Sequence, residues 1–142
     1  MEILFNFIKN NSILEIKQFI DNGGDVNAKA NNRRTPLMYA LEQKNNKDIL
    51  ELLINNGADV NAINNNGRTL LMVALWCNNN KDIIQLLLNN GADVNAKNNI
   101  SNTPLIIALL NKSNKDIIQL LLDNGADDDL ETLQKKLKES DY

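Results

Sequence analysis

The chain has 142 residues, 43% apolar but only 4% aromatic, so any core it builds must consist mainly of leucine and isoleucine. Its formal net charge of −3 argues against a general nucleic-acid binder, because neutralising phosphates requires a basic surface. It contains no histidine and one cysteine, Cys77, which excludes histidine metal ligands, Ser-His or Cys-His catalytic pairs, and an internal disulfide.

The chain also lacks the features of a targeting or membrane segment. Its first residues show no basic leader and no small residues of a cleavage site. No apolar run approaches the ~18 residues that span a bilayer. A single cysteine suits a reducing compartment. We therefore expect a cytoplasmic protein that binds no cofactor, no metal and no membrane. We expect a monomer, with the alternative that an incompletely polar cap lets arrays stack end to end.

The dominant signal is a repeat with a period of 34 residues. Glycines at four corresponding positions keep this spacing: Gly23, Gly57, Gly91 and Gly125. Threonines at three corresponding positions keep it as well: Thr35, Thr69 and Thr103. A period in this range is typical of a solenoid, in which each unit packs only on its neighbours.

Residues 1–28 predict an N-terminal capping unit of two short helices. The apolar residues of Met1 to Asn10 fit one buried stripe. Ser12 and Glu15 are predicted to form a capping box that opens the second helix. Asn22-Gly23 is expected to end that helix, because glycine accepts the positive φ found there.

Three further units each predict a hairpin-like turn followed by two antiparallel helices: residues 29–62, 63–96 and 97–129. Thr35-Pro36 and Thr103-Pro104 are strong helix starts, because threonine can cap the first turn and proline already has a helical φ angle. Leu70 replaces the proline in the middle unit. The helices of that unit are expected at Thr69 to about Cys77 and about Lys81 to Asn89.

Residues 130–142 predict a C-terminal capping helix. Leu130, Leu133 and Leu137 lie at helical spacing, and the other positions are mostly polar. The acidic run from Asp127 to Asp129 precedes them. Carboxylates favour a helix N-terminus, an interpretation that we prefer to a site for a hard cation.

These repeats resemble the ankyrin family, through the stretches Gly57 to Ala62, Thr35-Pro36-Leu37 and Ile118 to Leu122. The resemblance covers nearly the whole chain and implies an all-α solenoid of helix-turn-helix units joined by β-hairpin-like loops, with a cap at each end. The histidine of the family's Thr-Pro-Leu-His motif is replaced by Met38, Met72 and Ile106. Its hairpin aspartate is replaced by Ala30, Asn64 and Asn98, which we expect to remove polar ties within the loops.

An aspartate and an asparagine recur at each junction between units: Asp25, Asp59 and Asp93, with Asn27, Asn61 and Asn95. We expect their side chains to bond to the backbone of the turns rather than to hold a ligand. The resemblance further makes the three asparagines candidates for hydroxylation.

Function is expected at the positions that differ between units, because identical positions serve stacking. The resemblance implies a non-catalytic protein-protein interaction module that binds a partner protein on its concave face, made of hairpin tips and first helices. The predicted partner-binding residues are Lys29, Asn31, Asn32, Arg34, Gln43, Ile63, Asn65, Asn66, Arg68, Trp76, Lys97, Asn99, Ile100, Asn102 and Leu110.

Trp76 is the only tryptophan, at a position where the sister units have Glu42 and Leu110. A core role would recur from unit to unit, and tryptophan is enriched among interface anchors. We therefore favour an exposed or half-exposed anchor over a buried packing residue. Ile63 and Ile100, together with Leu110, would give it an apolar neighbourhood.

The basic residues of the tips would attract an acidic segment of the partner: Lys29, Arg33, Arg34, Arg68 and Lys97. A solvated basic edge without a partner is an equally good interpretation. The alternative function is a structural or engineered scaffold, or a fragment of a longer array, without a dedicated partner. Nucleic-acid binding by the tips is disfavoured, because they lack interleaved aromatic residues. Cys77 has no accompanying base and is expected to be an unreactive thiol.

Overall fold

The structure is a computed structural model, and it describes residues 2–43, 47–77 and 80–140. Over these residues the chain forms nine α-helices and no strand beyond an isolated bridge between Ile63 and Thr69. The helices are α1 (Glu2–Lys9), α2 (Ile13–Asp21), α3 (Pro36–Glu42), α4 (Lys47–Asn55), α5 (Leu70–Cys77), α6 (Lys81–Asn89), α7 (Pro104–Leu110), α8 (Lys115–Asp123) and α9 (Leu130–Ser140). The prediction of an all-α fold is confirmed.

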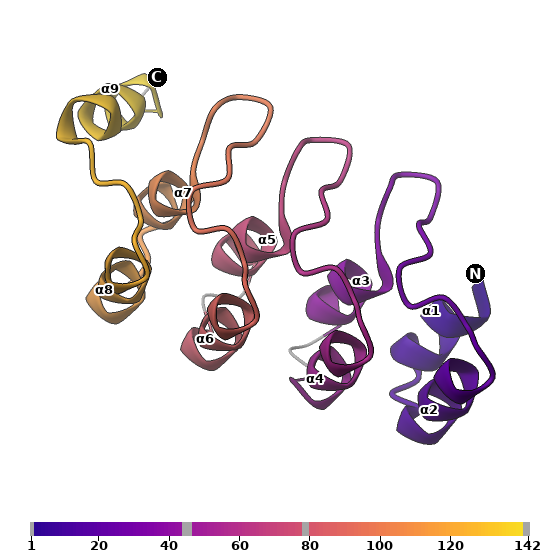
Figure 1. The fold of residues 1–142 in the computed structure, drawn as a ribbon. Helices are drawn as coiled ribbons and strands as arrows, with labels where there is room; N and C mark the ends of the chain where they lie inside the picture. The colour runs from indigo at the N-terminus through magenta and orange to yellow at the C-terminus, as the bar shows by residue number, and fades with distance from the viewer. Residues whose placement is uncertain (1, 44–46, 78–79, 141–142) are drawn as a thin grey trace.

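The helices stack as antiparallel pairs (Figure 1). The first helices α1, α3, α5 and α7 form one row and pack on one another in that order. The second helices α2, α4, α6 and α8 form the other row, and three hairpin loops project past the first row. Helix α9 packs on α7 and lies beside the last hairpin.

The recurring threonines cap the first helices as predicted. The Oγ1 atom of Thr35 accepts a hydrogen bond from the backbone N–H of Met38 at 3.2 Å. Thr103 accepts one from Ile106 at 3.3 Å. Thr69 does the same for Met72, also at 3.3 Å, although its unit lacks the proline. A cap of this kind contributes about 1 kcal/mol to the stability of its helix.

The capping box predicted for Ser12 and Glu15 is wrong. Helix α2 begins directly after Ser12, but the serine side chain accepts no hydrogen bond from the helix. Ser12 has φ −90° and ψ 75°, outside the extended conformation that capping requires. The cause is the tight turn before it, where Asn11 has a φ of 56° and the N–H of Ser12 donates to the carbonyl of Phe7 at 2.9 Å.

Each second helix ends at a glycine with a φ between 83° and 91°, as the sequence predicts. At the end of α4, the N–H of Gly57 donates to the carbonyl of Ile54 at 3.1 Å, and that of Ala58 to the carbonyl of Leu53 at 3.0 Å. The left-handed glycine thus satisfies carbonyls at the end of the helix that would otherwise lack a partner.

The core runs through the whole stack and consists mainly of leucine and isoleucine, as the composition indicates. Helix α2, in the first helix pair, has polar residues at two positions where α4 has apolar ones. Ile49 of α4 is fully buried, whereas Glu15 is exposed at the position 34 residues earlier on α2. Gln18 is likewise exposed where Leu52 is half-buried. At these two positions the first helix pair exposes polar side chains where the next pair has apolar ones, although Ile3 remains exposed at the position equivalent to the buried Leu37.

The junction asparagines join successive units. The Nδ2 of Asn27 donates to the carbonyl of Gly57 at 2.9 Å, and its Oδ1 accepts from the N–H of Asp59 at 2.8 Å. Asn61 and Asn95 repeat both bonds one and two units further along. The expected structural role is confirmed, because each side chain uses its donor and its acceptor on turn backbone.

The acidic run before α9 also has a structural role. Oδ1 of Asp129 accepts a hydrogen bond from the N–H of Glu131 at 3.2 Å, and the hydroxyl of Thr132 donates to Oδ2 at 2.6 Å. The Thr132 hydroxyl lowers the pKa of Asp129, because this hydrogen bond favours the ionised carboxylate. The carboxylate therefore caps the helix, as preferred from the sequence.

Candidate functional site

The residues predicted to bind a partner lie on what we name the hairpin face: the hairpins 27–34, 61–68 and 95–102 with the first helices α3, α5 and α7. Most of them are exposed: Lys29, Asn31, Asn32, Ile63, Asn65, Asn66, Trp76, Lys97, Asn99 and Ile100. Four are half-buried: Arg34, Gln43, Arg68 and Leu110. Asn102 is buried, with 8% of its surface exposed, and is therefore not a free tip residue.

The hairpins are held by their own asparagines. Oδ1 of Asn64 accepts hydrogen bonds from the N–H groups of Asn66 and Arg68, at 2.9 and 3.1 Å. Asn98 holds the next hairpin through the equivalent pair of bonds. The expected loss of polar ties is thus wrong for these two loops, because an amide oxygen accepts the bonds as a carboxylate would. Ala30, at the same position in the first hairpin, has no side chain to make them.

The second and third hairpins are bonded to each other at their tips. Nδ2 of Asn99 donates to the carbonyl of Asn65, and its backbone N–H donates to the carbonyl of Asn66, both at 3.2 Å. This approach requires Gly67, whose φ is 70° and at which a Cβ atom would collide with the Asn99 side chain. The spacing between these two tips is therefore fixed.

Between these two units, the hairpin face carries an apolar pocket of about 190 Å³. Trp76 lines it and is 52% exposed, which confirms the predicted exposure of this side chain. The lining residues are Arg68, Met72, Trp76, Asn98, Ile100, Asn102, Ile107 and Leu110. Ile100 and Leu110 are thus brought to Trp76 as expected. Ile63, which pairs with Thr69 at the base of its hairpin, does not line the pocket.

The backbone of Trp76 is fixed by the following unit. Nδ2 of Asn111, at the end of α7, donates to the carbonyls of Leu75 and Trp76, at 2.8 and 3.1 Å. These carbonyls at the end of α5 have no partner within their own helix. The bond of Asn111 to the preceding unit is a tertiary contact that its position at the end of a first helix does not indicate.

The arginines that end the first two hairpins meet different partners. Arg34 forms an ion pair with Glu42, and its guanidinium carbon lies 5.0 Å from the ring centroid of Tyr39. Arg68 lies over the ring of Trp76, with its guanidinium carbon 5.9 Å from the centroid. Both distances lie within the range of cation–π attraction.

A second hollow, about 530 Å³ in volume, lies one unit earlier on the same face. Its lining is mostly polar: Asn32, Arg34, Met38, Glu42, Asn64, Asn65, Asn66 and Val73. The hairpin face therefore changes from polar to apolar along the stack, and Trp76 marks the change.

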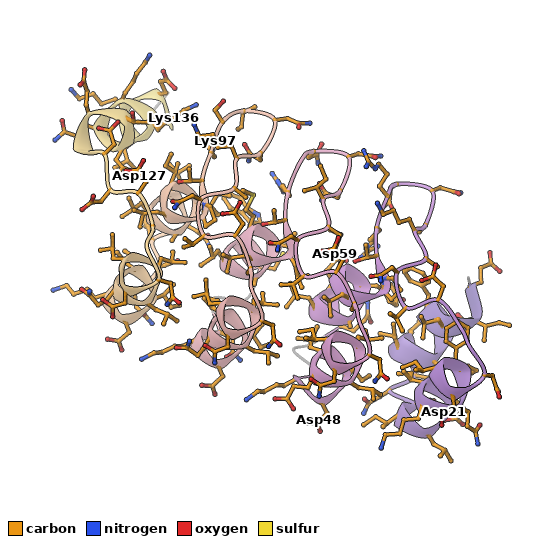
Figure 2. All side chains as sticks on the ribbon, viewed as in Figure 1. Asp21, Asp48, Asp59, Lys97, Asp127 and Lys136 are labelled. Carbon is orange, nitrogen blue, oxygen red and sulfur yellow. The ribbon has the colours of Figure 1, made fainter. Side chains whose placement is uncertain are left out.

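Charge is also unevenly distributed. The three hairpins contain five basic residues and no acidic residue: Lys29, Arg33, Arg34, Arg68 and Lys97. Acidic side chains occur on the second helices, where Asp21 and Asp48 lie away from the hairpins (Figure 2). A protein with a net charge of −3 thus has a basic hairpin face.

Cys77 is a free, exposed thiol. No group of three or more potential metal-ligating side chains comes together among the described residues. No described helix is long and apolar enough to cross a membrane.

Comparison with known protein families identifies the repeats. A family model described as ankyrin repeats (3 copies) matches residues 4–98 and 64–132, which together cover most of the chain. No curated protein matches the sequence. Ankyrin repeats generally mediate protein-protein interactions and are typically non-catalytic.

Proposed function

The chain belongs to the ankyrin repeat family, and on that premise we propose that it is a non-catalytic protein that binds a partner protein on its hairpin face, the concave face of the sequence prediction. Trp76 is the central anchor. The observation that carries this proposal is the pocket that the half-exposed indole forms with Ile100 and Leu110.

The exposed indole offers substantial binding energy. Burying a tryptophan removes roughly 200 Å² from water, and about half of the Trp76 surface is still exposed. Covering that remainder would contribute on the order of 2 kcal/mol, at about 25 cal/mol for each Å² of apolar surface. A contribution of this size is typical of a residue that dominates an interface.

The face is also rigid where the pocket lies. Asn99 ties the two hairpin tips, and Asn111 holds the backbone of Trp76. Because these groups are already ordered, a partner loses less conformational entropy on binding. The basic hairpins favour a partner segment that is acidic, since complementary charge increases the association rate and disfavours other partners.

The test is selection of short peptides from a random phage-displayed library on the immobilised wild-type protein. Binding of the selected peptides is then measured on Trp76→Ala and on Leu14→Ala. Leu14 is a matched control, because it is an exposed apolar side chain on α2, outside the hairpin face. We expect Trp76→Ala to weaken binding by about tenfold or more and Leu14→Ala to leave it unchanged. Equal binding to all three proteins would overturn the proposal.

A role as a structural scaffold is favoured by a different observation, the hydrogen bonds through which Asn27, Asn61 and Asn95 join the units. These bonds hold the array together whether or not a partner binds. If the chain is a scaffold without a dedicated partner, we expect the wild-type protein to select no peptide from the library.

A further inference from the structure

The repeated sequence offers an internal comparison for Arg68. Arg34 and Arg68 occupy equivalent positions at the ends of two hairpins, and Glu42 and Trp76 occupy equivalent positions on α3 and α5. Arg34 pairs with the carboxylate of Glu42. At the next unit the carboxylate is gone and the indole of Trp76 lies in its place. Arg68 has therefore lost the internal counter-ion that its equivalent has.

Nothing in the described part of the chain replaces that carboxylate. The ion pairs there involve Arg34, Lys47 and Lys136, and none involves Arg68. The pocket that Arg68 lines contains no acidic residue. The guanidinium lies over the indole ring, and its N–H donors can form a bidentate bond to a carboxylate.

We propose that Arg68 binds a carboxylate of the partner, in the role that Glu42 has for Arg34, while the pocket beside it takes an apolar side chain of the same partner segment. The inference rests on the proposed function, because it assigns the chemistry of the same face. It goes beyond that function by naming Arg68 as the residue that determines specificity, and by naming the partner's side chains: one carboxylate and one apolar side chain.

The segment is extended. The hairpin tips present exposed asparagine side chains, which can donate to and accept from a peptide backbone: Asn31, Asn65 and Asn66. An extended chain leaves its backbone groups free for such bonds, whereas a helix uses them internally. In an extended chain, every second side chain points to the same face, with about 6.6 Å between them. Arg68 lines the same pocket as Ile100 and Leu110, so two side chains on one face of the segment can reach the guanidinium and the apolar lining. The selected pair is therefore an apolar residue and an Asp or Glu two positions away.

Two variants test the role of Arg68, and the first is based on the Arg34–Glu42 pair of the preceding unit. Trp76→Glu restores the acidic residue of the preceding unit and gives Arg68 an internal counter-ion. Arg68→Gln removes the charge but keeps an amide donor. Arg33→Gln is the matched control, because it removes one positive charge from the same face without altering the pocket.

The probes are peptides selected from the random phage-displayed library on the wild-type protein, synthesised with a fluorescent label and measured by anisotropy. We expect the selected sequences to share the apolar and acidic pair at that spacing. Binding should weaken by about tenfold in Arg68→Gln and in Trp76→Glu, but less than about twofold in Arg33→Gln. Thermal unfolding of each variant shows whether its fold is retained.

Each other outcome overturns a defined claim. Peptides that bind Arg68→Gln as tightly as wild type, yet lose affinity on Trp76→Ala, overturn the role of Arg68 and leave the proposed function standing. If Arg33→Gln weakens peptide binding as much as Arg68→Gln does, the basic face attracts the peptide only by its overall charge, and the specific role of Arg68 is overturned. Selected peptides whose acidic residues lie at no fixed distance from an apolar residue overturn it as well. Peptides that are insensitive to Trp76→Ala, or the absence of any selected peptide, overturn the inference together with the proposed function.

Discussion

Asn61 accepts a hydrogen bond on its side-chain oxygen from the backbone N–H of Asp93, 32 residues further along the chain, at 2.8 Å. The Nδ2 of the same side chain donates to the carbonyl of Gly91, also at 2.8 Å. The Asn61 side chain therefore joins two adjacent units through both its donor and its acceptor. Since a solenoid depends on contacts between neighbours, this side chain contributes to the stability of the whole stack.

Replacing Asn61 with alanine should lower the free energy of unfolding by about 1–2 kcal/mol, because two hydrogen bonds of about 1 kcal/mol each are lost at a partly hydrated site. Urea denaturation followed by circular dichroism measures the change. Asn55→Ala, at the exposed end of α4, is the control and should have less effect. Equal stability of Asn61→Ala and wild type would contradict the bridging role.

Thr69 caps the N-terminus of α5, which has Leu70 at the position where α3 and α7 have a proline. Thr69 is buried and accepts a hydrogen bond from the N–H of Met72. Thr69→Ala should therefore lower the free energy of unfolding by about 1–2 kcal/mol, whereas Thr69→Ser, which keeps the hydroxyl, should lower it by less. The same urea measurement decides between them. If serine and alanine are equally destabilising, the loss comes from the methyl group and not from the cap.

Helix α9 should become less stable in acid. The pKa of Asp129 is lower in the folded protein than its usual value of 3.8, mainly because the hydroxyl of Thr132 donates to the carboxylate. This stabilisation is fully present above the unfolded pKa and is lost as the pH falls through the folded pKa. A carbon-detected NMR titration of the Asp129 carboxyl group should show its pKa rising toward 3.8 in Thr132→Val. An unchanged pKa in that variant would exclude the hydroxyl as the cause.

Lys136 of α9 reaches the last hairpin, where Lys97 also lies (Figure 2). Its Nζ donates to the carbonyl of Ile100 at 2.8 Å, and Ile100 lines the apolar pocket. Lys136→Met should therefore loosen the tip of this hairpin, seen as faster hydrogen exchange of the Ile100 amide, with little change in global stability. Lys135→Met is the control, because Lys135 is exposed on the same helix. Equal exchange in the two variants would show that α9 does not hold the hairpin.

Most of the fold could be predicted from the sequence, because the period of 34 residues fixes the order and phase of the helices. Helix α6 begins and ends at the expected residues, Lys81 and Asn89. The exposure of Trp76 followed from its failure to recur. The capping box at Ser12 was wrong because Ser12, directly after the left-handed Asn11, lacks the extended backbone that capping requires, and the residue types do not reveal that geometry.

The pocket could be predicted only in part. Met72 and Ile107 line it but were missed, because apolar residues recur at their positions and recurrence was taken to indicate stacking. Asn102 was expected at an exposed tip, but it pairs with Asn98 at the base of the hairpin and is buried there. The contact between the end of a hairpin and the end of its first helix was not predicted, because spacing along the sequence does not show that the arginine reaches there. Once that contact is known, the different partners of Arg34 and Arg68 follow from Glu42 and Trp76 at equivalent positions.

The emission of Trp76 tests the central claim most directly, because it is the only tryptophan in the chain and lies half-exposed in the pocket. A selected peptide without tryptophan is titrated into the wild-type protein. We expect the emission to shift to shorter wavelength as the indole is covered, with a midpoint equal to the dissociation constant measured by anisotropy. A peptide that binds by anisotropy while the emission stays unchanged would show that the partner contacts the molecule elsewhere.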